Sequence, residues 1–396
     1  MTTNRDRWLS RDGLLLSLSA FFADLGYQGV TALYPLYIVL DLHKSPLIYG
    51  IITGLGFGVG SLFAFVGGWL GDRYNQKLIA IIGNVGILLL AFSGSTSNIT
   101  ISGAMFMAGW WFRYLRTPVR RAMLVQVTKP EYRTKVFGFL HTLDVGGGVL
   151  SVLLAIGLLW LHLSTGKVIL LAAIPIAMSS LVLLPVSLSK LYPVRQSTTN
   201  TNTQSMASAH IRRRLFISIL IAAGLYGFSF YNLGFPVLSA AKIGKIAIAG
   251  LAAYALYLGV SALSGWLLGR ANLKGLRPLW RWGFLPSAVA SLGIAINSFM
   301  HGNILGLYLA VSLLGLGMGA VETYEPALAA SLRNNEDISR GMGWLSVARS
   351  LGQFGANFIM GALFVVGEGY AYLFAGAAAL AAAIVIAVSE HQNQDK

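Results

Sequence analysis

Apolar runs of about 20 residues recur along the whole chain, and they constrain its fold more than any other feature. A run of that length crosses the roughly 30 Å hydrocarbon layer of a membrane as a single helix. Only 11% of the 396 residues are charged and the mean hydropathy is +0.68, whereas a soluble domain carries about 25% charged residues. We therefore expect an all-α integral membrane protein.

Segmenting the sequence by hydropathy predicts twelve transmembrane helices. A polar and then basic segment, 190–214, divides them into two sets of six. We expect an N-terminal six-helix bundle over 1–189, a cytoplasmic linker over 190–214 and a C-terminal six-helix bundle over 215–396. The predicted spans are 13–40, 47–70, 78–95, 100–123, 135–160, 167–189, 215–239, 246–268, 279–299, 304–330, 341–366 and 369–389.

The net charge of +15 is explained by membrane topology. Nearly all Lys and Arg residues outside the predicted spans fall on the side of the two termini. The opposite side carries only four: Lys44, Lys167, Lys242 and Lys245. The positive-inside rule then places both termini in the cytoplasm, and the surplus charge is attracted to anionic lipid headgroups. We expect a protein of the cell membrane with no nucleic-acid partner.

A short charged loop at 68–77 recurs at 265–274. Both copies carry Gly, Trp, Leu, Arg, Asn and Lys at one constant offset, but Gly269 replaces the acid Asp72 in the second copy. Further matches link the first and seventh, fourth and tenth, and fifth and eleventh spans. The sequence thus predicts a duplication into two pseudo-symmetric halves, an architecture suited to alternating access.

The 68–77 loop resembles the signature loop of the major facilitator superfamily: Gly68, three residues, Asp72-Arg73 and a terminal Lys77. The chain is similar to the prokaryotic proton-coupled permeases of that superfamily. Asn75 stands where the family has Gly, a replacement that is tolerable because Asn also enters the left-handed backbone region. The glycines of the predicted fifth span also resemble the family's antiporter motif.

The resemblance implies that this loop is a cytoplasmic gate. The C-terminal end of a helix disfavours an anion, so Asp72 needs a cation, and Arg120 or Arg121 at the same membrane face would serve. The predicted gate residues are Gly68, Asp72, Arg73, Lys77, Arg120 and Arg121.

Ionisable residues inside predicted spans are costly and are candidates for function. They are Asp24, Arg113, Arg116, Arg120, Asp144, Glu322, Glu325 and Arg349. The three arginines of the fourth span share one helix face by their spacing. Depth along the helices predicts that Asp24 pairs with Arg113 and Asp144 with Arg116. In the second half Arg349 takes the place of Asp144 and is expected to pair with Glu325 or Glu322, so the two halves exchange the sign of their charges.

Two roles for these groups stay open. Desolvation disfavours a charged carboxylate and a nearby arginine favours it, so Asp24, Glu322, Glu325 and Asp144 are proton-coupling candidates, with Asp24 ranked first. The alternative is that Arg116, Asp144, Glu325 and Arg349 lock helices together and touch no substrate. The substrate-cavity candidates are Asp24, Tyr27, Trp110, Arg113, Tyr114, Arg116, Tyr226 and Tyr231. His141, three residues before Asp144, is either a packed side chain or a proton shuttle.

The sequence contains no cysteine, no metal-ligand spacing, no phosphate-binding loop and no nucleophile motif. We therefore expect neither an enzyme nor a cofactor, a metal or ATP drive. The favoured hypothesis is a monomeric secondary transporter that moves a small molecule by alternating access, coupled to protons and working as an export antiporter. Two alternatives remain: uptake or exchange of an anionic metabolite held by Arg113 and Arg116, and a membrane sensor or scaffold that does not transport.

Overall fold

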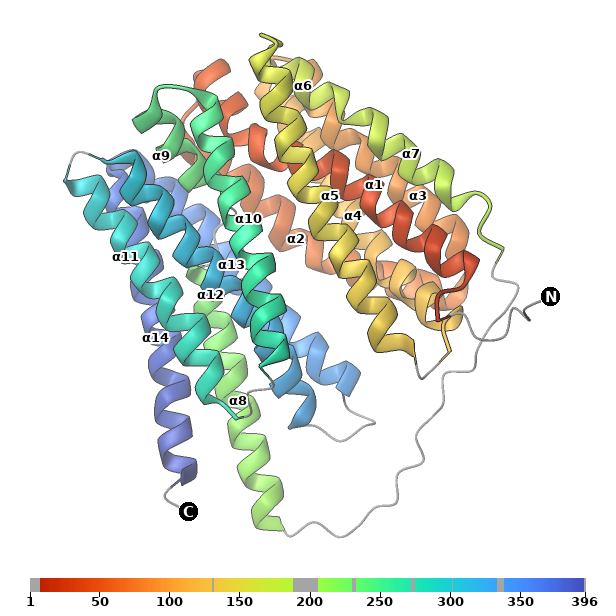
Figure 1. Ribbon diagram of the computed structural model, residues 1–396, viewed down its shortest axis with the longest axis vertical. Helices are drawn as coiled ribbons and strands as arrows, with labels where there is room; N and C mark the ends of the chain where they lie inside the picture. Colours follow the sequence, from red (N-terminus) through yellow and green to blue (C-terminus); the bar gives the residue numbers. More distant parts are fainter. Residues whose placement is uncertain are drawn as a thin grey trace. The chain divides into compact units, whose positions relative to one another are not determined.

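The computed structural model describes residues 8–129, 132–187, 206–229, 233–271, 275–300, 302–332 and 338–394. Within these ranges the regular structure is entirely helical (Figure 1). The chain divides into two compact units. The first comprises Met1–His43 and Leu55–Gln196, and the second comprises Lys44–Gly54 and Ser197–Lys396. The short segment Lys44–Gly54, placed in the N-terminal bundle by its position in the sequence, is thus grouped with the second unit.

Most helices of the first unit are long enough to cross a membrane. In chain order the elements are α1 (Arg11–Leu36), continued by the π-helix η1 (Tyr37–Asp41), α2 (Pro46–Arg73), which belongs to the first unit from Leu55 onward, α3 (Gln76–Phe92), the 3-10 turn η2 (Ser93–Ser95), α4 (Ile99–Gln126), α5 (Arg133–Trp160) and the two short helices α6 (Thr165–Leu171) and α7 (Ala173–Leu183). The predicted sixth span is therefore two helices that meet at Ala172.

The second unit repeats this order. Its helices are α8 (Met206–Ser229), α9 (Gly234–Gly244), α10 (Ala247–Arg270), the π-helix η4 (Leu279–Phe284), α11 (Leu285–Phe299), α12 (Ile304–Ser331), α13 (Ile338–Val366) and α14 (Glu368–Gln394). The linker prediction was too long, because residues 206–214 already belong to α8.

Nine helical segments of the described residues are long and apolar enough to span a bilayer. Three of the twelve predicted spans are not among them, namely α1, α4 and α13. These are the helices that carry Asp24, the three arginines at 113, 116 and 120, and Arg349, and such side chains lower the mean hydropathy. A multi-pass membrane fold is confirmed, and the count of twelve spans stays a prediction.

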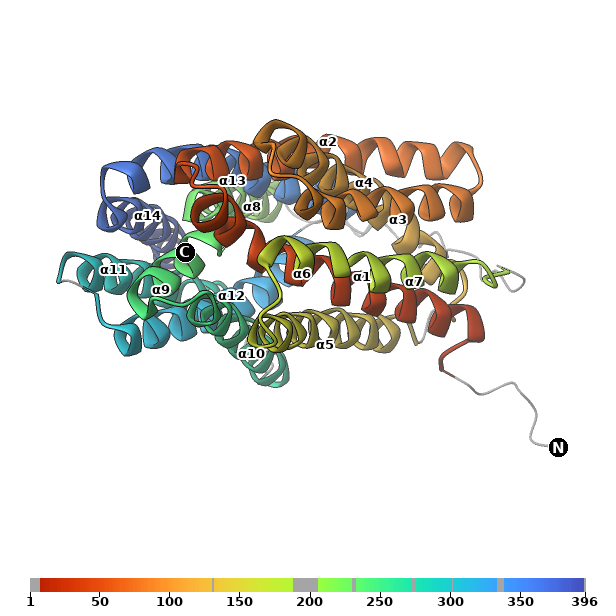
Figure 2. The same ribbon diagram turned by 90° about the horizontal axis from the view of Figure 1, so that it is seen from above.

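Helix packing within each unit follows one scheme. In the first unit α1 packs against α5 and α7, and α3 packs against α4 and α7 (Figure 2). In the second unit α8 packs against α13 and α14, and α11 packs against α12 and α14. These are corresponding pairs in the order of spans, as the predicted duplication requires.

Glycines at equivalent places allow two of these crossings. A Cβ atom at Gly147 of α5 would lie 2.7 Å from the carbonyl oxygen of Phe21 on α1. At Gly352 of α13 it would lie 2.9 Å from the Cα atom of Gly227 on α8. Small residues let membrane helices approach closely. The α1–α5 and α8–α13 contacts therefore each depend on a glycine, and the two glycines occupy matching positions of the repeat.

The duplicated loop keeps one contact in both copies. The Arg73 guanidinium lies over the Trp69 ring at 4.7 Å, and Arg270 lies over Trp266 at 3.8 Å. Asn75 does not use the left-handed conformation that Asn tolerates: its φ is −64° and ψ 109°, and its side chain accepts a hydrogen bond from the Leu78 N–H. Asn75 is the N-cap of α3, a role for which Asn is among the preferred residues.

Candidate functional site

The first unit contains a polar cluster between α1 and α4. Asp24 is only 4% exposed and accepts a hydrogen bond of 2.5 Å from the Tyr27 hydroxyl. The Gln28 amide donates a second, longer one at 3.3 Å. Spacing of three and four residues on α1 brings these three side chains to one face of the helix.

Arg113 of α4 lies next to this group. Its guanidinium carbon is 4.7 Å from the centre of the Tyr27 ring and 4.8 Å from that of Trp110, with Tyr114 at 5.9 Å. These distances fall in the range of cation–π contacts. The predicted direct pair between Asp24 and Arg113 is not formed; the Tyr27 ring stands between them, accepting the cation on its face and donating its hydroxyl to the acid.

Arg116 is fully buried, and its partner is a neutral amide. Its Nη1 donates to Asn84 Oδ1 at 2.6 Å. Asn84 Nδ2 in turn donates to the hydroxyls of Ser19 and Ser179 at 3.2 and 2.9 Å. Glycine makes this reach possible, because a Cβ at Gly83 would lie 2.6 Å from that of Arg116. The α3–α4 crossing is therefore close enough for the hydrogen bond.

Asp144 of α5 pairs with Arg120. Arg120 Nη2 lies 3.7 Å from Asp144 Oδ2, and Arg120 is buried. The prediction of an Arg116–Asp144 pair is therefore wrong: the partner is one turn further along α4. The pairing of Arg120 or Arg121 with the gate residue Asp72 stays a prediction, because the Asp72 side chain lies outside the described residues.

The second unit contains a smaller cluster of opposite net charge. Arg349 of α13 forms ion pairs with both Glu322 and Glu325 of α12, as predicted. Glu325 is completely buried, whereas Glu322 is half exposed. Tyr226 of α8, a predicted cavity residue, is buried and shares a 3.0 Å hydrogen bond with Ser287.

The ion pairs of the two units have opposite polarity, as predicted. The first unit links helices α4 and α5 through Arg120 and Asp144, and the second links α12 and α13 through two glutamates and Arg349. The first cluster contains three guanidinium groups and two carboxylates. Among the described residues, Arg113 forms no ion pair and Arg116 contacts only a neutral group, so this cluster carries surplus positive charge.

Several buried donors of the first cluster have no hydrogen-bond partner among the described residues. They are Trp110 Nε1, Arg113 Nε, Arg116 Nε, Arg120 Nε and Arg120 Nη1. Buried polar groups are nearly always hydrogen-bonded, so each exception calls for an explanation. Chemically, the free N–H groups of this cluster can donate hydrogen bonds to the oxygens of an anionic group. Its carboxylates can gain or lose a proton.

The remaining predicted residues have other surroundings. Lys77 Nζ donates to the carbonyl of Leu184 at the end of α7, at 2.6 Å, and Arg73 stacks on Trp69. A Cβ atom added at Gly68 would meet no heavy atom of the described residues within 4 Å. Tyr231 lies outside the described residues, as do the side chains of Asp72 and His141.

Sequence reasoning missed Asn84, Ser19 and Ser179. Asn84 is the one polar side chain in the part of α3 from Leu78 to Phe92, and this was the one available signal. No set of three or more His, Cys, Asp or Glu side chains that would suit a metal ion gathers in the described part of the chain.

Comparison with known proteins agrees with this architecture. A sequence profile described as Major Facilitator Superfamily matches residues 16–356. Among solved structures, the POT family transporter PepTSo superposes with a TM-score of 0.77 at 12% identity, covering 99% of each chain. A POT family transporter in complex with 5-aminolevulinic acid gives 0.75 at 14% identity, covering 96% of each chain.

A point mutant of the nucleoside transporter NupG gives a TM-score of 0.72 at 12% identity, over 96% of this chain and 100% of that one. At such low identities these structures establish a shared fold, while the profile match extends over most of the sequence. The chain therefore belongs to the major facilitator superfamily: it is a multi-pass membrane transporter, not an enzyme.

Proposed function

We propose that this protein is a proton-coupled secondary transporter of a small organic solute and that it works by alternating access as an antiporter, exporting the solute. Asp24 is proposed as the coupling acid. The observation that carries the proposal is its setting: a buried carboxylate that accepts a hydrogen bond from the Tyr27 hydroxyl, with the Arg113 guanidinium over the face of the same ring. Ionisable side chains placed this way in membrane helices mark ion and substrate pathways.

Tyr27 is the connecting element in this scheme. Its hydroxyl donates a hydrogen bond to the Asp24 carboxylate, and its ring is covered by the Arg113 guanidinium. A solute that draws the Arg113 guanidinium away from the ring would alter the surroundings of Asp24. Solute binding and protonation would thereby influence one another, as linked equilibria must.

Proteoliposomes containing the full chain test this proposal. With an imposed pH gradient and a panel of labelled solutes, an antiporter accumulates solute when the vesicle interior is acidic, whereas a symporter does so when it is alkaline. Asp24→Asn should abolish the effect of the gradient while solute exchange at equal pH remains. Gradient-driven accumulation by Asp24→Asn at the rate of the unmodified protein would refute the coupling role.

A second candidate function is uptake or exchange of an anionic metabolite. The surplus of guanidinium groups over carboxylates and the unfilled donors of Arg113 and Arg116 favour it specifically. Planar guanidinium groups bind carboxylates and phosphates through two parallel hydrogen bonds, which lysine cannot reproduce.

Arg113→Lys separates the two functions. The variant keeps a positive charge near the aromatic rings but loses the planar guanidinium group and its paired hydrogen bonds. If the solute is an anion held by Arg113, its apparent KM should rise about tenfold or more, since one charge-assisted hydrogen bond contributes roughly 1.5–3 kcal/mol. If the solute is uncharged, KM should stay within about twofold.

A further inference from the structure

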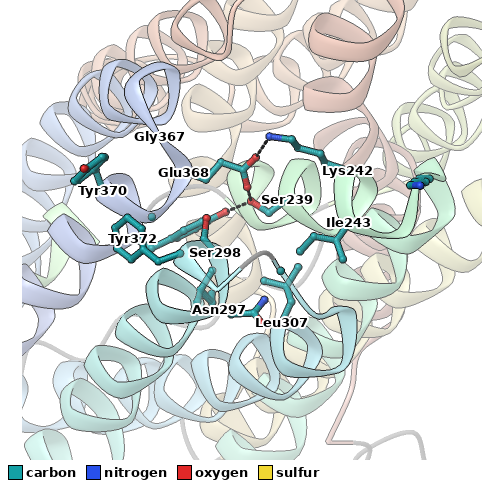
Figure 3. A pocket seen from close by; sticks show the side chains of 15 residues that line it. Ser239, Lys242, Ile243, Asn297, Ser298, Leu307, Gly367, Glu368, Tyr370 and Tyr372 are labelled. Atoms are coloured by element: carbon teal, nitrogen blue, oxygen red, sulfur yellow. Dashed lines mark hydrogen bonds and ion pairs between the residues drawn. The ribbon is translucent and has the colours of Figure 1, made fainter.

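A cavity of about 630 Å³ lies within the second unit, where α9 and α11 end and α14 begins. Figure 3 shows its polar side chains, among them Ser239, Lys242, Glu368 and Tyr372. Its volume is typical of small-molecule sites. None of the transport residues discussed above lines it, and the positive-inside rule places this end of the helices on the external side.

One wall of the cavity is fixed by a hydrogen-bond network. The Ser239 hydroxyl donates to Glu368 Oε2 at 2.7 Å and lies 2.7 Å from the Tyr372 hydroxyl. Lys242 Nζ donates to Glu368 Oε1 at 2.8 Å (Figure 3). Glu368 is therefore satisfied from within the protein, and Lys242, whose side chain is exposed, places its charge at the edge of the cavity.

Lys245 brings a second cation. It lines the cavity, its side chain is exposed, and no acidic group of the described residues pairs with it. It caps α9 in the left-handed conformation, with φ 53°, a position at which helices usually carry Gly or Asn. The external side has only four basic residues in all, and two of them meet at this cavity.

Aromatic side chains border the cavity next to these cations. Phe299 and Tyr370 both line it, their rings are 5.4 Å apart, and they are 51% and 50% exposed. Aromatic residues are enriched at the level of the lipid headgroups. The cavity thus offers cations for an acidic group and, beside them, an exposed apolar surface for hydrocarbon.

We propose that this cavity binds the phosphate headgroup of a phospholipid, with Lys245 and Lys242 on the phosphate and the acyl chains along Phe299 and Tyr370. Occupancy would order the junction of α9, α11 and α14. The site is separate from the transport residues, so the proposal does not depend on the identity of the solute.

Calorimetric titration of the purified full-length chain in detergent tests the proposal. The probes are dihexanoyl phosphatidylglycerol, a water-soluble phospholipid, and inorganic phosphate. Lys245→Gln should weaken phospholipid binding about tenfold, the expected loss for one charge-assisted contact, and Lys245→Arg should restore most of it. Lys167→Gln is the matched control, because it removes an exposed lysine from the same side of the first unit.

Two outcomes would overturn the proposal. Equal phospholipid affinity in Lys245→Gln and the unmodified chain would exclude the cavity as the binding site. Equal affinity for inorganic phosphate and the phospholipid would show that the apolar border contributes nothing and that the site takes a soluble anion.

Discussion

Replacing Arg349 by glutamine tests whether the cluster of the second unit stabilises the fold. Arg349 pairs with Glu325, which is 0% exposed, and with Glu322, whose side chain is 49% exposed. Removing one partner of a buried ion pair costs about 3–5 kcal/mol because the other charge is left without compensation. An exposed pair contributes about 0–1 kcal/mol. We therefore expect Arg349→Gln to cost about 3–5 kcal/mol and Glu322→Gln to cost less than about 1 kcal/mol.

The double variant Arg349→Gln/Glu325→Gln isolates the pair. It replaces both charges of the buried pair by neutral amides and leaves no buried charge without compensation, so it should cost less than either single change on the buried pair. The coupling free energy of the cycle should reach about 2–3 kcal/mol. Reversible unfolding in mixed detergent micelles, followed by tryptophan fluorescence, measures all four proteins.

Additive costs in this cycle, or a cost below about 1 kcal/mol for Arg349→Gln, would refute the reasoning. The same proteins also decide between the two roles left open for this cluster. A double variant that is stable and still transports marks the pair as a helix lock. One that is stable but no longer transports places the pair in the transport cycle.

Two other substitutions test the packing of the first unit. Asn84→Leu leaves a buried guanidinium without its acceptor and should cost about 3 kcal/mol or more of unfolding free energy. Asn84→Asp supplies a carboxylate to Arg116 and should stay within about 1.5 kcal/mol of the unmodified chain; a loss for Asn84→Leu no greater than that for Asn84→Asp would contradict the role of this contact. Gly67→Ala drives a Cβ into the backbone of Leu115 and should cost about 1–3 kcal/mol, whereas Gly68→Ala meets open space and should be neutral or gain up to about 1 kcal/mol. Thermal unfolding monitored by circular dichroism compares these neighbours, and a reversed order would contradict the α2–α4 packing.

The sequence predicted the helices of this protein better than it predicted the contacts between their side chains. Hydropathy located the apolar spans and the repeat aligned the two halves, because both are properties of the chain itself. Counting residues along a helix gives depth but leaves the choice between Arg116 and Arg120 open, since both lie on one face. The partner of Asp144 is decided by how α4 crosses α5, and the role of Asn84 by how α3 approaches α4.

The Arg349 pairs could be predicted because two carboxylates are within reach of a single arginine. Glu322 and Glu325 lie one turn apart on α12, so either helix rotation brings a carboxylate to the single arginine of α13. Asn75 illustrates a different difficulty. Asn suits both the left-handed region and a helix N-cap, and the start of α3 at the next residue selects the cap.

The two loops that end α2 and α10 form an internal control within one molecule. Both stack an arginine on a tryptophan, yet only the first includes an acid, with Gly269 at the matching place in the second. The arginine–tryptophan contact at the end of the helix therefore forms both with and without a carboxylate beside it, although a helix C-terminus does not favour an anion. This contact therefore gives no reason to keep Asp72, and we expect the role of its carboxylate to be confined to the first half.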